Sequence, residues 1–135
     1  MGRYEKLILA LKGDKRSFQR AYRQLVTAPP LGGKALERHL LHNPDAYIRE
    51  TCAEILRDRC KARAIPSLIL ALKDESQYVR DDALWAIEEL AGYRTGTLFY
   101  LLDICVQDPP KKLLSTIERW WAANSEILRQ SKCLW

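Results

Sequence analysis

The sequence has few of the residues from which metal sites are built. It contains two histidines and four cysteines, and no two cysteines form a CxxC pair. The cysteines are Cys52, Cys60, Cys105 and Cys133. A zinc site needs about four clustered ligands, and His39 and His42 share a helix face without a nearby cysteine. We therefore predict no metal and no cofactor, and we interpret the thiols as core or incidental residues.

Catalytic motifs are missing as well. The sequence has no glycine-rich phosphate loop, no nucleophile elbow and no HExxH helix, and neither histidine is paired with a serine or cysteine in a recognisable arrangement. Asp81 and Asp82 are adjacent, so they project in different directions from a helix and do not converge like the carboxylates of a glycosidase. These absences predict that the chain is not an enzyme.

Long apolar runs are also absent. The opening Met-Gly-Arg-Tyr-Glu-Lys lacks the apolar stretch of a signal peptide, and no stretch reaches the roughly 18 uncharged residues of a membrane span. Hydrophobic residues nevertheless make up 47% of the 135 residues, which is enough to bury a core in one domain. We expect a single soluble, cytoplasmic domain over residues 1–135.

An internal repeat is the strongest positive feature. The hexapeptide LILALK occurs at residues 7–12 and again at 68–73. This separation corresponds to two repeat units of roughly 31 residues each, a length typical of helical solenoids. A shift by one such unit also aligns HLLHNPDAYIRETCAEIL with LALKDESQYVRDDALWAI. We therefore expect a solenoid in which each unit packs on its neighbours.

Apolar periodicity divides the chain into helix pairs, each with a first helix, a turn and a second helix. The predicted units cover residues 4–27, 34–59, 64–92 and 97–129. Two prolines and two glycines within residues 28–33 are expected to separate the first two units. The last unit is degenerate, and in its long second helix we expect one of Trp120 and Trp121 to be buried and the other exposed. The sequence thus predicts an all-α, right-handed α-solenoid of about four pairs with a C-terminal cap.

The repeated segments resemble a known family. NPDAYIRETCAEIL and DESQYVRDDALWAI, together with IPSLILALK, are similar to HEAT repeats, and more narrowly to the short HEAT-like class named after phycobilisome (PBS) lyases. The resemblance is strong over residues 34–92, fair over 4–27 and weak after 97. It implies that the second helices line a concave face.

The resemblance also implies a ladder of arginines between repeats. In this family an arginine follows the first apolar residue of each second helix, and Arg49 and Arg80 match that position, whereas Gln19 replaces it in the first unit. The acidic turn position of the family is matched by Asp45 in the second unit and is replaced by Gln77 in the third.

Helical spacing predicts which side chains a ligand would contact. If Val79 points inward, the positions two, six and nine residues further on point away from the core. They are Asp81, Trp85 and Glu88 in the third unit, Glu50, Glu54 and Arg57 in the second, and Arg20, Gln24 and Thr27 in the first. Trp85 is singled out because the repeat does not require an aromatic there and tryptophan is the commonest interface hot spot. Tyr47 and Tyr78 start the second helices and either join this face or pack between units.

The net charge of +5 conceals a segregated surface. Residues 1–34 carry eight Lys or Arg and two acidic residues, whereas residues 76–91 carry one arginine and four acidic residues. Recognition of duplex nucleic acid needs a continuous basic stripe, which an acidic centre interrupts.

The leading hypothesis is a non-catalytic protein-interaction module, that is, an adaptor, assembly factor or inhibitor, whose second helices bind a protein of unknown identity. Its expected contact residues are Trp85, Asp81, Glu88, Glu50, Glu54, Tyr47, Tyr78 and Arg20. An alternative implied by the resemblance is a bilin lyase or a bilin-handling accessory protein. A third is nucleic-acid binding by the basic N-terminal unit. A homodimer through the tryptophan-rich C-terminal end is also open.

Overall fold

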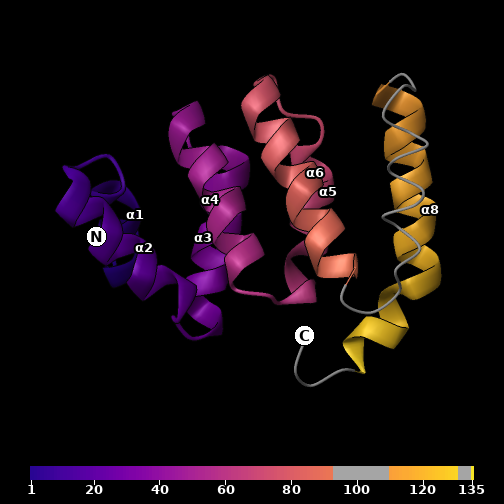
Figure 1. Ribbon diagram of the computed structural model, residues 1–135, viewed down its shortest axis with the longest axis horizontal. Coiled ribbons are helices and arrows are strands. Elements are labelled where there is room, and N and C mark those ends of the chain that lie inside the picture. The colour runs from indigo at the N-terminus through magenta and orange to yellow at the C-terminus, as the bar shows by residue number, and fades with distance from the viewer. Residues whose placement is uncertain (93–109, 131–134) are drawn as a thin grey trace.

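The protein is a single row of packed helices. The structure, a computed structural model, describes residues 1–92, 110–130 and 135. These residues form seven α-helices, one short 3-10 helix and no strand. The helices follow one another along the row as neighbouring pairs, ending with α8 (Figure 1). The predicted all-α solenoid is confirmed, whereas the first part of the predicted unit 97–129 lies outside the described residues. None of the described helices combines the length and apolarity needed to cross a membrane.

Each pair joins two helices through a short turn. The helices are α1 (Arg3–Ala10), α2 (Lys15–Val26), α3 (Pro30–His42), α4 (Ala46–Asp58), η1 (Ala62–Ala64), α5 (Ile65–Ala71), α6 (Gln77–Gly92) and α8 (Pro110–Arg129). Asp14 caps α2 by accepting a hydrogen bond from the Ser17 amide at 2.8 Å, and Asp45 caps α4 by accepting one from the Tyr47 amide at 2.9 Å. These caps fix where the second helices of the first two pairs begin.

The third helix starts earlier than the sequence predicts, at Pro30 rather than at residue 34. A proline in the first turn costs no hydrogen bond, because its missing amide hydrogen has no partner inside the helix. The two following glycines are buried, and a Cβ on Gly32 would lie 2.5 Å from the Cβ of Ala28. Residues 27–29 therefore separate α2 from α3, whereas Pro30, Gly32 and Gly33 belong to the tightly packed first turn of α3.

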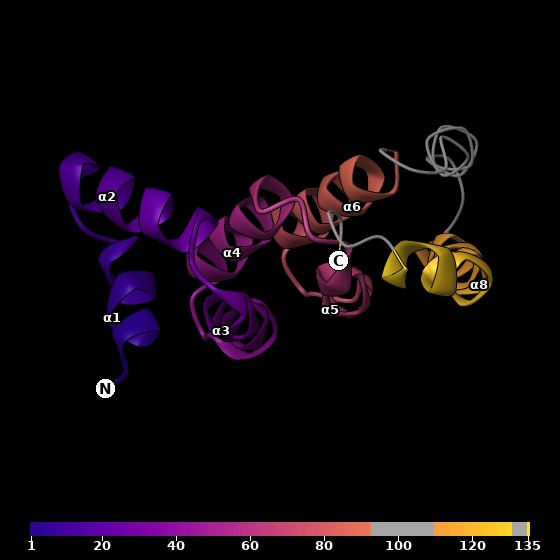
Figure 2. The ribbon, with the colours of Figure 1, turned by 90° about the horizontal axis from the view of Figure 1, so that it is seen from below.

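The helices form two layers with the core between them. Helices α1, α3 and α5 make one layer, and α2, α4 and α6 make the other, which lies on the inner side of a shallow curve (Figure 2). α4 is central and packs on α2, α3 and α6. The fully buried side chains include Leu25, Leu36, Leu40, Ile48, Ile55, Leu68, Ile87 and Leu90. Burial of each such side chain contributes about 1.5–3 kcal/mol, so packing between helices stabilises the row.

A buried ion pair links the second unit to the third. Arg49 on α4 donates from Nε to Asp74 at 2.8 Å and from a terminal nitrogen at 3.1 Å, and the two side chains are only 8% and 10% exposed. The hydrogen bond that Arg49 donates to the Asp74 carboxylate is the main cause of the raised pKa of Arg49. Arg49 also donates to the Asn43 carbonyl, and Arg80 donates to the Asp74 carbonyl, which is the equivalent position in the next unit. The arginine positions implied by the family resemblance therefore bind the turns.

The acidic residue of this ladder differs from the expected one. Arg49 pairs with Asp74 of the next unit, whereas Asp45 pairs with Lys12 of the preceding unit. Both contacts join the turn of one unit to its neighbour. These two ion pairs therefore hold neighbouring units together along the edge of the solenoid where the turns lie.

The C-terminal helix brings three tryptophans together. Trp120 is 6% exposed, as expected for one of the two adjacent tryptophans. Trp121 differs from the expectation because it is half-buried: its ring stacks on Trp135, with centroids 6.3 Å apart and an interplanar angle of 9°. A homodimer through this end stays a prediction.

Candidate functional site

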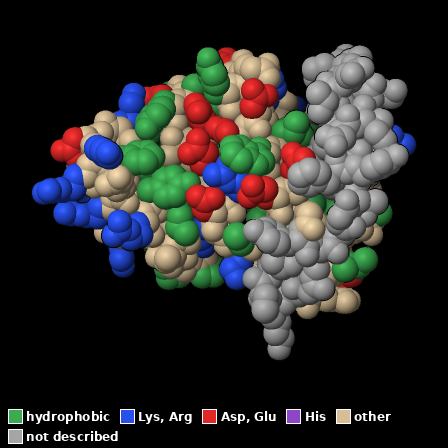
Figure 3. Space-filling model, in the orientation of Figure 1, with side chains coloured by type: hydrophobic (Ala, Val, Ile, Leu, Met, Phe, Trp, Pro, Cys, Tyr) green, Lys and Arg blue, Asp and Glu red, His purple; other side chains and the backbone are tan. Residues whose placement is uncertain are grey.

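The outward-pointing side chains of α2, α4 and α6 form a continuous face, which we call the inner face. Figure 3 views the protein from this side. Lysine and arginine side chains gather over its N-terminal end, whereas acidic side chains gather at its centre among large hydrophobic ones (Figure 3). The segregation of charge seen in the sequence is therefore a segregation in space.

Trp85 of α6 is held on the inner face by a cation. The Cζ atom of Arg57 on α4 lies 4.1 Å from the centroid of the Trp85 ring. Arg57 is itself fixed by Asp58 at 3.1 Å and by Glu89 at 3.8 Å. Trp85 remains 51% exposed, so the contact orients the indole without burying it.

Three carboxylates, Glu50, Glu54 and Asp82, form what we call the acidic cluster. Glu50 and Glu54 are one turn apart on α4 and Asp82 lies on α6, and one oxygen from each falls within 4.8 Å of the others. Burial, followed by the charges of Glu54 and Glu50, raises the pKa of Asp82 to about 6. Burial and Glu50 also raise the pKa of Glu54. Near neutral pH the cluster therefore concentrates negative charge on the inner face.

The structure brings some predicted contact residues together and separates others. Glu50 and Glu54 meet in the acidic cluster, but their partner on α6 is Asp82. Asp81 instead lies exposed and accepts a hydrogen bond from Gln77 at 2.6 Å. The spacing from Val79 identified the side chains of α6 that point away from the core. A carboxylate that meets Glu50 and Glu54 must instead project from the side of α6 that faces α4.

The remaining predicted residues lie at different places on the helices. Glu88 is half-buried on α6, and Tyr47 and Tyr78 are exposed at the starts of α4 and α6. Neither tyrosine is buried between units. Arg20 lines a shallow groove on α2 with Arg16 and Arg23, in the basic part of the face.

An aromatic groove between α2 and α4 was not predicted. Phe18 and Tyr22 stand one turn apart with ring centroids 5.6 Å apart, and they line a groove of about 620 Å³ with Val26 and Glu54. Tyr22 donates a hydrogen bond to Asp58 at 2.5 Å, and burial together with this carboxylate raises the pKa of Tyr22. Their spacing of four residues places the two rings on the same side of α2, which is the one signal in the sequence for this pair.

A family profile described as HEAT repeats matches residues 33–119 of the chain. The chain belongs to the HEAT-repeat family. The match begins inside α3 and ends inside α8, so it includes the helices that carry the acidic cluster and Trp85. No curated protein and no solved structure gives a significant match. HEAT repeats are commonly protein-interaction modules and generally lack enzymatic activity.

Cys52, His39 and the acidic cluster differ in the chemistry that their surroundings allow. Cys52 is buried in the core, and burial raises the pKa of its thiol to about 12, which removes its nucleophilic thiolate at neutral pH. His39 binds Glu5 and shares a hydrogen bond of 3.0 Å with Asn43, so it ties α1 to α3. The acidic cluster offers the oxygen type that hard cations bind, but three ligands fall short of the roughly six to eight around Ca²⁺.

Proposed function

We propose that this HEAT-repeat chain binds another protein on its inner face, with Trp85 as the apolar anchor. The observation that carries the proposal is the half-exposed Trp85 held on Arg57 beside the acidic cluster. Tryptophan is the commonest hot-spot residue, and an indole already oriented by a cation loses less conformational freedom on binding. An adaptor, an assembly factor or an inhibitor would each use such a surface.

The charge of the inner face supports a partner with a basic side chain. Glu50, Glu54 and Asp82 present three carboxylates, and Arg57 is already engaged by Asp58, Glu89 and Trp85. Burial and then the charges of Glu54 and Glu50 raise the pKa of Asp82, and an arginine or lysine of the partner would offset those charges. Complementary charge of this kind guides association and sets the register of a complex.

Apolar surface is present at two places on the inner face. The aromatic groove of Phe18, Tyr22 and Val26 lies between α2 and α4, and Trp85 projects from α6. Glu54 belongs to both the groove and the acidic cluster. This arrangement suits a partner segment with two apolar anchors and a basic residue between them, such as one face of an amphipathic helix.

The bilin and nucleic-acid alternatives receive less support from the same charges. The propionates of a tetrapyrrole and the phosphates of a nucleic acid both require cations, whereas the centre of the inner face is acidic (Figure 3). Arg16, Arg20 and Arg23 on α2 would attract an anionic chain, but only over the first unit. The PBS-lyase subtype therefore stays a prediction from the resemblance.

Site-specific photo-crosslinking tests the proposal. A benzoylphenylalanine placed at Trp85 is compared with one at Leu70, which lies on α5 in the opposite layer and is 52% exposed against 51% for Trp85. We expect a single protein adduct from position 85 in cells of the native organism and none of that size from position 70. Equal labelling at both positions would contradict the assignment of the inner face. A labelled nucleic acid or pigment at position 85 would favour the corresponding alternative.

A further inference from the structure

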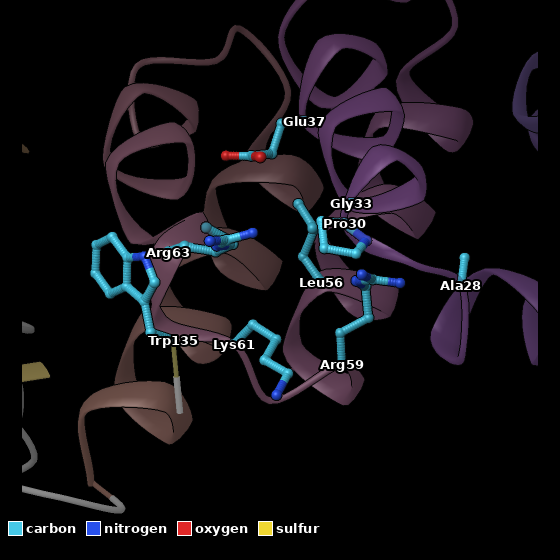
Figure 4. Close-up of a pocket in the computed structure, with 10 residues that line it drawn as sticks. Ala28, Pro30, Gly33, Glu37, Leu56, Arg59, Lys61, Arg63 and Trp135 are labelled. Atoms are coloured by element: carbon cyan, nitrogen blue, oxygen red, sulfur yellow. The ribbon is translucent and has the colours of Figure 1, made fainter. Parts of the chain in front are cut away.

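A separate cavity lies where the second unit meets the third, at the loop that follows α4. It has a volume of about 260 Å³ and is lined by residues of α3, the end of α4, η1 and the C-terminal tryptophan. Its apolar wall consists of Ala28, Pro30, Leu56, Ala64 and Trp135. Its charged residues are Arg59, Lys61, Arg63 and Glu37. Arg59 and Arg63 lie on opposite sides of the cavity, and Glu37 lies across from Lys61 (Figure 4). None of these residues belongs to the acidic cluster or to the aromatic groove.

Arg59 is fixed in the wall of the cavity by uncharged groups. Its guanidinium donates to the Leu25 carbonyl at 2.6 Å and to the Pro29 carbonyl at 3.4 Å. It forms no ion pair with any residue that the structure describes, and burial lowers its pKa. The absence of a side chain at Gly33 makes room for it, because a Cβ there would lie 3.1 Å from its terminal nitrogen. A guanidinium without an ion pair among the described residues is therefore built into the wall, with Glu37 as the carboxylate whose charge acts on it.

The rest of the cavity adds positive charge on one side and apolar surface on the other. Arg63 is exposed and forms no ion pair within the described part of the chain. Glu37, the one carboxylate in the lining, accepts a hydrogen bond from Ser67 at 2.7 Å. Trp135 supplies a flat wall whose ring is supported by stacking on Trp121. Three cations and one carboxylate surround an apolar pocket.

The backbone at the rim is unusual. Cys60 stands between Arg59 and Lys61 with a φ of 56°, in the left-handed region that residues other than glycine seldom adopt. This conformation reverses the chain directly after α4 and brings Lys61 and Arg63 to the same cavity as Arg59. A left-handed residue directly after the C-cap is a common way for a helix to end, so this conformation marks the end of α4.

We infer that this cavity binds a small organic anion, with a carboxylate or phosphate group held by Arg59 and Arg63 and a compact apolar body against Leu56, Ala64 and Trp135. Guanidinium groups suit such head groups because they donate parallel hydrogen bonds in a plane. The volume is just below the roughly 300–1,000 Å³ of sites that enclose drug-sized ligands, so it fits a smaller molecule.

The basic groove on α2 is a weaker candidate for such a ligand. It is lined by Arg16, Gln19, Arg20, Arg23 and Gln24, all polar, so it offers charge without an apolar wall. A small organic anion would gain only screened electrostatic attraction there. The cavity beside Arg59 combines both kinds of contact.

Isothermal titration calorimetry of the full chain at about 0.15 M salt tests the inference. The probes are phenyl phosphate and benzoate, with inorganic phosphate and benzyl alcohol as controls for the charge alone and the ring alone. We expect one saturable site for phenyl phosphate or benzoate, at least tenfold tighter than for either control. Quenching of tryptophan fluorescence on binding should be lost in Trp135→Phe.

Two arginine variants locate the site. Arg63→Ala should weaken binding at least tenfold, whereas Arg16→Ala, a change of an equally exposed arginine on α2, should leave it unchanged. Arg59 is left intact because it binds carbonyls at the end of α2. Matching thermal unfolding curves for wild type and Arg63→Ala verify that the fold is retained. The inference is overturned if neither probe binds saturably, if a control binds as tightly as the probes, or if both arginine variants lose affinity equally.

Discussion

The guanidinium of Arg57 on α4 lies 4.1 Å from the centre of the Trp85 indole on α6, so a cation of one repeat supports an aromatic side chain of the next. The same guanidinium contacts Asp58 and Glu89. Arg57 thus connects the acidic part of the inner face to its most prominent apolar side chain. Partner binding at Trp85 would be sensitive to this contact even if Arg57 itself touched nothing in the partner.

A double-mutant cycle should detect the contact between Arg57 and Trp85. We expect the coupling between Arg57→Ala and Trp85→Ala to be about 0.5–1 kcal/mol in the free energy of unfolding, as for a cation–π pair near the surface. Urea denaturation of the wild type, both single variants and the double variant provides the measurement. A cycle with Tyr78→Ala in place of Trp85→Ala serves as the control, and additivity in the first cycle would show that the contact contributes nothing.

Loss of the indole should weaken binding of the cross-linked partner more than it destabilises the fold. We expect Trp85→Ala to cost more than about 1 kcal/mol of binding free energy, as hot-spot truncations do. Leu70→Ala, at nearly the same exposure on the opposite layer, should leave the affinity unchanged. Surface plasmon resonance with the purified partner provides the comparison. Unchanged affinity for Trp85→Ala would remove this residue from the interface.

Stability should fall as the pH rises through the titration of Asp82. The folded protein binds this proton up to a pKa of about 6, whereas the unfolded chain releases it near the ordinary value. Between about pH 4 and 6 Asp82 therefore keeps more of its proton in the folded state, and its contribution to the free energy of unfolding decreases with increasing pH. Asp82→Asn removes this loss and should stabilise the protein at pH 7 by about 1 kcal/mol, after allowance for solvent screening.

The adjacent acid provides a matched control for this pH effect. Asp81 is exposed and lies outside the acidic cluster, so Asp81→Asn should leave the pH profile of unfolding as in the wild type. Thermal unfolding of both variants at a series of pH values between 4 and 8 gives the measurement. Identical profiles for Asp82→Asn and the wild type would mean that the three carboxylates do not repel one another as the geometry indicates.

Loss of the buried arginine should destabilise the stack strongly. Arg49→Ala leaves the Asp74 carboxylate, 10% exposed, without its charged partner and should cost about 3 kcal/mol, as when one member of a buried ion pair is removed. Arg38→Ala breaks the more exposed pair with Glu5 and should cost less than about 1 kcal/mol. Chemical denaturation compares the two, and equal small losses would contradict a structural role for the Arg49–Asp74 pair.

The close approach at Gly32 should not tolerate a methyl group. Alanine normally favours a helix over glycine by about 1 kcal/mol, but a Cβ at this position would lie 2.5 Å from the Cβ of Ala28. We expect Gly32→Ala to destabilise the protein by about 1–3 kcal/mol, as overpacking does. Gly2→Ala, where the nearest atom lies 3.7 Å from the added Cβ, is the control and should be near neutral by thermal unfolding.

Contacts within one helix or between equivalent repeat positions could be predicted from the sequence. Val79, the expected inward residue of its helix, is fully buried. Glu50 and Glu54 are one turn apart, so their proximity follows from helical geometry alone. The internal repeat similarly placed Arg49 and Arg80 at equivalent sites.

Contacts between different helices could not be predicted in the same way. The addition of Asp82 to the acidic cluster depends on the angle at which α4 and α6 pack, which the periodicity of either helix does not reveal. The partner of Arg49 lies in the next unit, at Asp74, because the turns of successive units lie side by side. The close packing of Ala28 on the first turn of α3 likewise depends on the missing side chain at Gly32, which the periodicity does not reveal.

The repeated hydrogen bonds to the turns also determine how this protein can change in length. Arg49 and Arg80 each bind the carbonyl six residues before them, at Asn43 and Asp74. Each of these turns therefore supplies the acceptor for an arginine of the helix that follows it. A copied repeat unit would carry both the arginine and its acceptor with it. Duplication or deletion of whole units would therefore change the number of helices on the inner face while each copied turn keeps the hydrogen bond to its own arginine. Gain or loss of a unit during evolution would lengthen or shorten the inner face by one helix at a time.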